Sequence, residues 1–169
     1  NKYNLELIGN YTLNVYNYYS TEYLKNLGIS NLCITPELND NDTQKLIETS
    51  TIPLELMVYG RIPFMTTNYC LLGNSNKCYK DCKHLCSTPN KYYIKDRLNL
   101  KFRIIPDNTS TITTIYNSKI TSFNYSEFNI DSVLISILDE NSNSIQNIIT
   151  TVYNNKRFEG NDFCGHFNK

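Results

Sequence analysis

Short apolar runs separated by turn-forming residues dominate the first sixty positions of the chain. Alternating or continuous apolar runs predict strands at residues 5–8, 12–16, 29–35 and 54–59. The first stretch with helical spacing begins at Ser20, a favourable N-cap, and ends at Gly28. Tyr23, Leu24 and Leu27 form its expected buried stripe.

A second helix is predicted from Asn39 or Asp40 to about residue 49, with Leu46 and Ile47 on its apolar side. Strands and helices that alternate at intervals of about twenty residues are typical of parallel β/α units. Catalytic groups in such folds lie at the C-terminal ends of the strands. The polar positions at the predicted ends are Asn14, Asn17, Glu37 and residues 59–61.

The pattern changes after residue 90. Short strands are predicted at residues 92–95, 100–105 and 111–116, with turns at 96–97 and 107–108, which indicates a small antiparallel sheet. One more apolar strand at 131–138 and a helix at 144–153 then restore the β/α alternation. We therefore expect an α/β fold with three parts. Residues 1–60 form β/α units, and residues 61–117 form a cysteine loop and a small sheet. The last part, residues 118–169, contains a closing β/α unit from 118 to 155.

Composition limits the partners. Sixteen basic and sixteen acidic residues give a formal net charge of zero, so no overall attraction to nucleic acid or membrane is expected. No apolar run approaches transmembrane length. We expect a soluble, cytoplasmic protein. The chain begins at Asn1 and opens directly into a strand-like pattern, which suggests a fragment whose missing N-terminal half is its first partner.

Four of the six cysteines lie within seventeen residues, at Cys70, Cys78, Cys82 and Cys86. The last three recur every fourth residue and would share one face of a helix if the segment coils. Lysines and His84 between them would favour thiolates. Thiolates held together in a reducing compartment bind zinc or an iron–sulfur cluster.

Two other interpretations of the cysteines remain open, a disulfide framework and unrelated free thiols. Crowding of the cysteines into one loop and a chain long enough to bury a core both favour metal ligation over disulfides. The spacing matches neither the paired zinc signature nor the ferredoxin run, so it does not choose the metal. Cys33 lies inside an apolar strand and is expected in the core, as is Cys164.

Candidates for catalysis outside the cysteine loop are few. Glu37 and Glu55 are carboxylates associated with strands, suited to acid–base work or to pairing with a nearby cation. Arg61 is suited to holding an anionic group. A thiol protease would need a cysteine paired with His84 or His166, and no serine-protease or zinc-protease motif is present.

Several motifs together resemble the collagenase-like peptidase family U32. They follow the family's order and cover nearly the whole chain: residues 13–17 (LNVYN), 35–38 (TPEL), 55–61 (ELMVYGR), 69–70 (YC), 95–97 (KDR), 115–118 (IYNS), Phe158 with Gly160, and 165–167 (GHF). The resemblance implies the C-terminal half of a TIM-barrel-like catalytic region. The family name implies proteolysis, whereas some relatives use a cysteine-bound iron–sulfur cluster in oxygen-independent, prephenate-dependent hydroxylation of RNA bases or in hydroxylation of quinone precursors.

The resemblance also suggests ligands. Cys70, Cys78 and Cys82 match the family's cluster cysteines, whereas threonines at 111, 113 and 114 stand where the fourth usually occurs. Cys86 is the expected substitute. Three hypotheses follow: a hydroxylating enzyme with an iron–sulfur cluster (or zinc), Glu37 and Glu55 as acid–base groups, Arg61 as anion clamp and RNA as substrate; a peptidase acting on peptides; and a non-catalytic, metal-stabilised domain.

Overall fold

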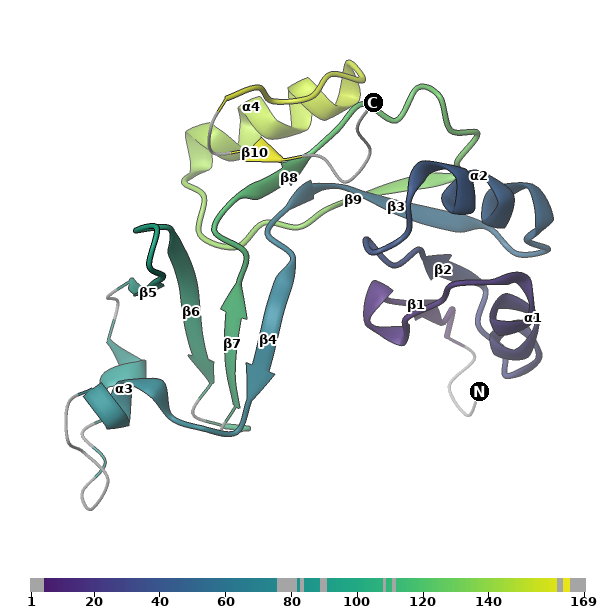
Figure 1. Ribbon diagram of the computed structural model, residues 1–169. Coiled ribbons are helices and arrows are strands. Elements are labelled where there is room, and N and C mark those ends of the chain that lie inside the picture. Colours follow the sequence, from purple (N-terminus) through teal and green to yellow (C-terminus); the bar gives the residue numbers. More distant parts are fainter. Residues whose placement is uncertain are drawn as a thin grey trace. The chain divides into compact units, whose positions relative to one another are not determined.

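The computed structural model describes residues 5–75, 82, 84–88, 91–107, 109–110, 112–160 and 163–164 (Figure 1). The chain divides into two compact units. Unit 1 contains residues 1–60 and 121–169, and unit 2 contains residues 61–120. Each unit has its own sheet, so each is considered by itself.

Unit 1 alternates strands and helices along the chain. Its elements are β1 (Ile8–Gly9), the 3-10 helix η1 (Tyr11–Leu13), α1 (Tyr18–Asn26), β2 (Asn31–Cys33), α2 (Asp40–Thr49), β3 (Leu54–Gly60), β8 (Ile120–Ser122, which begins at the last residue of unit 2), β9 (Ser132–Ile135), α4 (Ser142–Tyr153) and β10 (Phe163–Cys164). Among the described residues, no helix has the length and apolar character required to cross a bilayer.

Four strands of unit 1 are parallel neighbours in chain order. β1 pairs with β2, β2 with β3, and β3 with β9. β8 adds an antiparallel pair at the end of β3, through Tyr59 opposite Ser122, and β10 follows β8 in the sheet. The predicted mixed α/β fold with parallel β/α units is therefore confirmed. Its closure into part of a TIM-like barrel stays a prediction.

The core of unit 1 is centred on β2 and β3. Leu32, Leu54 and Leu56 are at most 2% exposed, and they share one face of the sheet by register. From α4, Ile148 and Val152 are also buried. Each such side chain contributes about 1.5–3 kcal/mol to the free energy of unfolding.

The first predicted feature to fail is the strand at 12–16. Residues Tyr11–Leu13 form a 3-10 turn, because the Asn10 side chain accepts a hydrogen bond from the Tyr11 N–H at 2.7 Å. Asn14 then adopts a left-handed conformation, φ 52°, which is incompatible with a strand. Asn14 and Asn17 consequently do not lie at the end of a strand, since β1 ends at Gly9.

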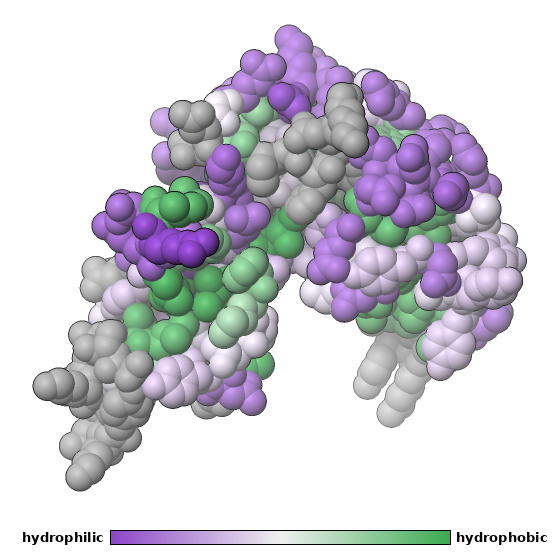
Figure 2. All heavy atoms as spheres, in the orientation of Figure 1, coloured by the Kyte–Doolittle hydropathy of each residue, from purple (hydrophilic) through white to green (hydrophobic). Residues whose placement is uncertain are grey.

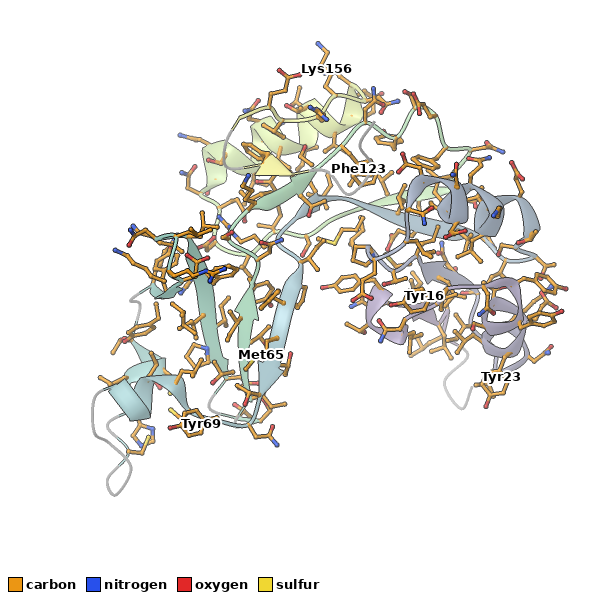
Figure 3. The ribbon with its side chains drawn as sticks, viewed as in Figure 1. Tyr16, Tyr23, Met65, Tyr69, Phe123 and Lys156 are labelled. Carbon is orange, nitrogen blue, oxygen red and sulfur yellow. The ribbon has the colours of Figure 1, made fainter. Side chains whose placement is uncertain are left out.

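The N-cap of helix α1 lies three residues before the predicted one. The Asn17 side chain accepts a hydrogen bond from the Ser20 N–H at 3.0 Å, so Asn17 is the cap and Ser20 lies inside the helix. The predicted apolar stripe is also wrong: Tyr23 is 65% and Leu27 60% exposed, whereas Thr21 is fully buried. Figure 3 shows the Tyr23 side chain extending away from α1.

The other helix boundaries follow the sequence closely. Gly28, with φ 93°, ends α1 as predicted, and the Asn39 side chain caps α2 through the Asp42 N–H. Helix α4 begins at Ser142, slightly before the predicted start at 144, because Asn141 supplies its cap. Asparagine at the N-cap position recurs in all three of these helices.

Unit 2 is a four-stranded antiparallel sheet with short helical turns. Its elements are β4 (Pro63–Thr67), α3 (Leu71–Ser75), the 3-10 helix η2 (Leu85–Ser87), β5 (Tyr92–Lys95), β6 (Lys101–Asp107) and β7 (Ile112–Tyr116), in the sheet order β4-β7-β6-β5. The three predicted strands are confirmed to within about two residues. Strand β4 was not predicted, because a proline at its start and threonines at its end resemble a turn.

Gly60 ends β3 at the boundary between the two units of the chain. Its φ is +139°, a conformation that favours glycine. A Cβ at this position would lie 2.6 Å from the Ser136 carbonyl oxygen, and the Ser136 N–H donates to the Tyr59 carbonyl at 2.8 Å. A larger residue would push the end of β9 away from β3.

Replacing the observed cap of α1 tests this description of its start. Asn17→Ala should lower the free energy of unfolding by about 1 kcal/mol, because the Ser20 N–H loses its acceptor. Ser20→Ala is the matched control and should change it by at most a few tenths of a kcal/mol, since Ser20 lies inside the helix. Urea unfolding followed by circular dichroism measures both values, and the reverse order of effects would restore Ser20 as the cap.

Candidate functional site

Glu55 lies on the parallel sheet of unit 1, directly between two polar neighbours. It is the second residue of β3, opposite Cys33 on β2 and opposite Ser132 on β9. Because paired residues project to the same side of a sheet, these three side chains share one face, which we call the Glu55 face. Ile8 and Asn31 belong to the same face by register. Glu55 is partly exposed.

A cavity of about 250 Å³ opens on this face. It is lined by Ile8, Asn10, Tyr11, Glu55, Leu134 and Ser136. Asn10 and Tyr11 follow the end of β1, and Ser136 follows the end of β9. Although Glu55 is near the start of β3, it is level with the last residue of the short strand β2. The cavity therefore lies at the carboxyl ends of two parallel strands, where ligand sites of parallel α/β folds occur.

Two further polar atoms on the Glu55 face lack hydrogen bonds. Asn31 Oδ1 and Ser132 Oγ are both buried, and neither has a partner among the described residues. Buried polar atoms without a partner are uncommon and costly, and they mark places where a ligand or water satisfies them. These atoms add to the case for a polar ligand on this face.

Cys33, on the Glu55 face, has a thiol of raised pKa. Burial, and then the charge of Glu55, raises the pKa of the Cys33 thiol to about 12. The side chain is 1% exposed, as the prediction of a core position requires. A thiol with this pKa is protonated at neutral pH, so Cys33 is a poor nucleophile there.

A larger cavity, of about 580 Å³, lies elsewhere in unit 1. It is bounded by the end of α2, residues 50–54 and residues 129–131. Here the Leu54 N–H donates to an oxygen of Asp131 at 3.0 Å, which ties the start of β3 to the segment before β9. These are the amino ends of the strands, where parallel α/β folds place stabilising rather than catalytic groups. We therefore regard the smaller cavity as the candidate site.

Glu37 follows β2 and is exposed. Its carboxylate accepts a short hydrogen bond from the Tyr16 hydroxyl. That bond is the main reason the pKa of Tyr16 is raised above its ordinary value. Figure 3 labels Tyr16, which lies in the segment between η1 and α1. The hydrogen bond links the segment before α1 to the segment after β2. The role of Glu37 in catalysis stays a prediction.

Arg61 is the first residue of unit 2. Its Nη1 donates to the carbonyl oxygens of Asn117 at 2.9 Å and Ser118 at 2.6 Å. These bonds fix the base of the sheet beside β4 and β7, together with the Asn117 N–H donating to the Ile62 carbonyl. The observed role of Arg61 is structural, and its predicted role as an anion clamp stays a prediction.

The cysteine segment belongs to unit 2. Cys70 and Cys82 are exposed and Cys86 is partly buried, and all three are free thiols. Cys78 lies outside the described residues, so convergence of all four cysteines stays a prediction. Within the described residues, no three His, Cys, Asp or Glu side chains are grouped as a metal site.

A continuous helix through the segment is wrong for its described part. Cys82 is not helical, and His84 has a left-handed backbone, φ 50°, before the single turn Leu85–Ser87. Cys82 and Cys86 therefore do not share a helix face. Cys70 precedes α3, and its sulfur accepts a hydrogen bond from the Gly73 N–H at 3.2 Å.

Neither histidine is shown to partner a cysteine. His84 is exposed and begins η2 without a side-chain cap hydrogen bond. His166 lies outside the described residues, as do residues 165 and 167 of the last motif. The described part of the chain therefore contains no cysteine–histidine pair suited to a thiol protease.

Comparison with known families identifies the chain at the family level. The model of peptidase family U32 matches residues 1–139, from before β1 through β9. The chain belongs to peptidase family U32. Comparison with curated proteins and with solved structures gave no match.

The U32 match covers the Glu55 cavity, Arg61 and the whole cysteine segment. It ends before α4, and so it does not include Phe158 or the motif at 165–167, which belong to the resemblance noted in the sequence. The resemblance to this family is thereby confirmed for the part of the chain that carries the candidate chemistry.

Several residues of the candidate site were not predicted. Asn10, Tyr11 and Ser136 line the cavity, and Cys33 contacts Glu55 electrostatically. Asn10 was missed because the end of β1 was predicted too early in the chain. A polar residue directly after each parallel strand is the signal that would have found Asn10 and Ser136.

Thiol labelling tests the Cys33–Glu55 contact. At pH 8 a thiol with a pKa of about 12 is ionised in about one molecule in ten thousand, roughly a thousandfold less than an ordinary cysteine. Iodoacetamide should therefore label the exposed Cys70 and Cys82 of the native protein and spare Cys33, as peptide mass spectrometry can measure.

The Glu55→Gln variant supplies the matched comparison. The charge of Glu55 raises the pKa of Cys33, so its removal should lower that pKa and speed labelling of Cys33 between pH 9 and 11. Urea-unfolded protein should label at all cysteines alike. Equal labelling of native Cys33 and Cys70 at pH 8 would contradict the described contact.

Proposed function

We propose that this U32 protein is a hydroxylating enzyme that acts on RNA bases, uses a metal group held by its cysteine segment and binds the reacting group at the Glu55 cavity. The observation that carries the proposal is the set of free thiols at Cys70, Cys82 and Cys86, none of them in a disulfide. The Glu55 cavity, at strand ends in a matched part of the family, supplies the second half of the argument.

The donor chemistry fits an iron–sulfur cluster, with zinc as the alternative. Thiolates are the preferred ligands of both. Cys70, Cys78, Cys82 and Cys86 are the residues that would hold the group, and Cys70 Sγ already accepts a hydrogen bond from the Gly73 N–H. An iron–sulfur cluster supplies one-electron redox chemistry when bound.

Glu55 has the position for a general base. Its carboxylate lines the cavity, and its neighbours across the sheet, Cys33 and Ser132, offer no competing positive charge. It can accept a proton from a ligand donor in the cavity, and Asn10 and Tyr11 can orient that ligand by hydrogen bonds. Glu37, joined to Tyr16, offers a second carboxylate at the surface of the same unit.

Proteolysis, which the family name implies, is the second candidate and has less support. A thiol protease needs a nucleophile of lowered pKa beside a histidine, whereas burial and Glu55 raise the pKa of Cys33 to about 12. The exposed Cys70 and Cys82 have no histidine partner among the described hydrogen bonds. The third hypothesis, a non-catalytic domain stabilised by metal, expects the same cysteines to bind the metal and gives Glu55 no role.

The proposal is tested with anaerobically purified protein. Iron, acid-labile sulfide and zinc should be measured per chain, together with the visible absorption spectrum. Cys70→Ser and Cys78→Ser should each remove most of the bound metal and its absorption, because a ligand is lost. The control Cys33→Ala should keep the metal, since Cys33 lies in the other unit.

Glu55→Gln separates the three hypotheses. For a hydroxylating enzyme it should keep the metal and lower hydroxylation of RNA, read as the gain of one oxygen atom by mass spectrometry, by about a hundredfold or more. Unchanged turnover would remove Glu55 from the mechanism. Peptide cleavage that survives loss of the metal would establish the peptidase instead. Bound metal with neither hydroxylation nor peptide cleavage would support the third hypothesis, a non-catalytic domain stabilised by metal.

A further inference from the structure

The charge of this protein is divided unequally between its two units. Unit 2, residues 61–120, contains ten Lys or Arg residues and three Asp, which gives a formal net charge of +7. The remainder contains six Lys or Arg and thirteen Asp or Glu, a net charge of −7. The overall value of zero therefore hides a strongly basic unit 2 and an acidic unit 1.

Part of this charge lies on one face of the unit 2 sheet. Tyr93 is opposite Arg103, and Lys95 is opposite Lys101, in the antiparallel pair of β5 and β6. These four residues alternate with Tyr92, Ile94, Phe102 and Ile104, so they share a side that we call the basic face. Tyr93 is 45% exposed, and both lysines are exposed.

The opposite side of the same strands is the packed one. Ile104 is 4% exposed, and the Tyr92 hydroxyl donates to the Leu85 carbonyl of η2 at 3.0 Å. The basic face is thus the side of β5 and β6 that η2 does not cover. Figure 2 shows strongly hydrophilic residues gathered over the end of unit 2 that contains β5.

Arg103 and Tyr93 form a preorganised flat surface. The guanidinium lies 5.5 Å from the centre of the Tyr93 ring, and its Nη1 donates to the carbonyls of Tyr92 at 3.1 Å and Ile104 at 2.8 Å. These bonds hold the cation over one face of the aromatic ring. An exposed ring next to a fixed guanidinium is the arrangement on which unpaired bases stack.

The two lysines oppose the stability of the sheet. Like charges directly opposite each other in an antiparallel pair are destabilising. Neither Lys95 nor Lys101 forms an ion pair with a described residue. The described acidic residues of unit 2 are engaged in turns: Asp96 accepts from the Leu98 and Leu100 N–H groups, and Asp107 from Thr109 and Ser110. A polyanion bound at this face would relieve the repulsion between the two lysines.

Protection of the edge strand is the structural explanation to weigh against binding. A lysine on an edge strand discourages pairing with other chains, and β5 is an edge strand. That role accounts for Lys95, but it does not account for Lys101 on the inner strand β6 or for the exposed Tyr93. Charge alone would suit any polyanion, whereas the ring and guanidinium favour one with unpaired bases.

We propose that the basic face of unit 2, formed by Tyr93, Lys95, Lys101 and Arg103, binds single-stranded nucleic acid, with the lysines on phosphates and Tyr93 stacked on a base. This inference deepens the proposed function, which requires a nucleic-acid substrate. It is independent of the metal, because binding at this face uses none of the cysteines.

Binding is measured by fluorescence anisotropy with a labelled single-stranded RNA of mixed sequence, titrated with the 169-residue chain at several salt concentrations. Affinity should fall with salt, because counterions leave the phosphates. Tyr93→Ala should weaken binding about tenfold with an unchanged salt slope. Lys95→Ala and Lys101→Ala should each reduce the slope of log K against log salt by about 0.7.

Matched controls come from unit 1. Lys156→Ala and Tyr153→Ala remove an exposed lysine and an exposed tyrosine near the end of α4 (Figure 3 labels Lys156) and should leave binding unchanged. Lys101→Glu should weaken binding further while raising the urea midpoint, since it turns the repulsion with Lys95 into an attraction. A merely structural lysine would not combine these two effects.

The outcomes distinguish the ligand classes. Similar affinity for single-stranded DNA keeps the proposal, and preference for RNA narrows it to contacts with the 2′-hydroxyl. Equal competition by polyglutamate, or loss of binding in the unit 1 controls, would overturn it as charge without recognition. Absence of RNA binding at 50 mM salt would also overturn it. RNA binding by anaerobically purified protein that contains no metal and does not hydroxylate RNA would keep this inference and refute only the proposed function.

Discussion

Parallel pairing on strand β3 is the constraint on which unit 1 depends. β3 is the longest strand of that unit, and every residue from Leu56 to Gly60 is buried. It pairs with β2 on one side and with β9 on the other, and its last residues also pair with β8. A strand with neighbours on both sides must satisfy its backbone within the sheet, so its residues are apolar except where a site requires otherwise. Glu55 is that exception.

The position of Glu55 explains why its neighbours are unusual. A carboxylate in a buried strand loses hydration, and the sheet gives it Cys33 and Ser132 rather than a cation. The charge is tolerated because the cavity keeps it partly accessible. Burial, and then the same charge, raises the pKa of Cys33 and so makes that thiol less reactive. A carboxylate held without a cation in a parallel sheet is better explained by ligand binding than by stability.

The sequence correctly predicted the strands and helix ends that depend on residues close together in the chain. Apolar runs located β2, β3 and the strands of unit 2, and Gly28 and Asn39 marked helix ends because glycine and asparagine act through their own backbone or side chain. It failed where tertiary packing decides. Tyr23 and Leu27 have helical spacing, yet Thr21 takes the buried position, since the neighbouring elements leave room for a small side chain. Convergence of cysteines from 70 to 86 depends on long-range loop geometry, which spacing does not encode.

Net charge was the least informative sequence quantity, for a physical reason. Electrostatic attraction acts over about one Debye length, roughly 8 Å at physiological salt, so a ligand responds to the local surface and not to the sum over the chain. Division of the chain at residues 60 and 120 turns a net charge of zero into +7 and −7. The acidic unit holds the Glu55 cavity, which would repel a polyanion by itself. The other unit of the same chain carries the opposite charge, and the net charge of the whole chain reveals neither of these local charges.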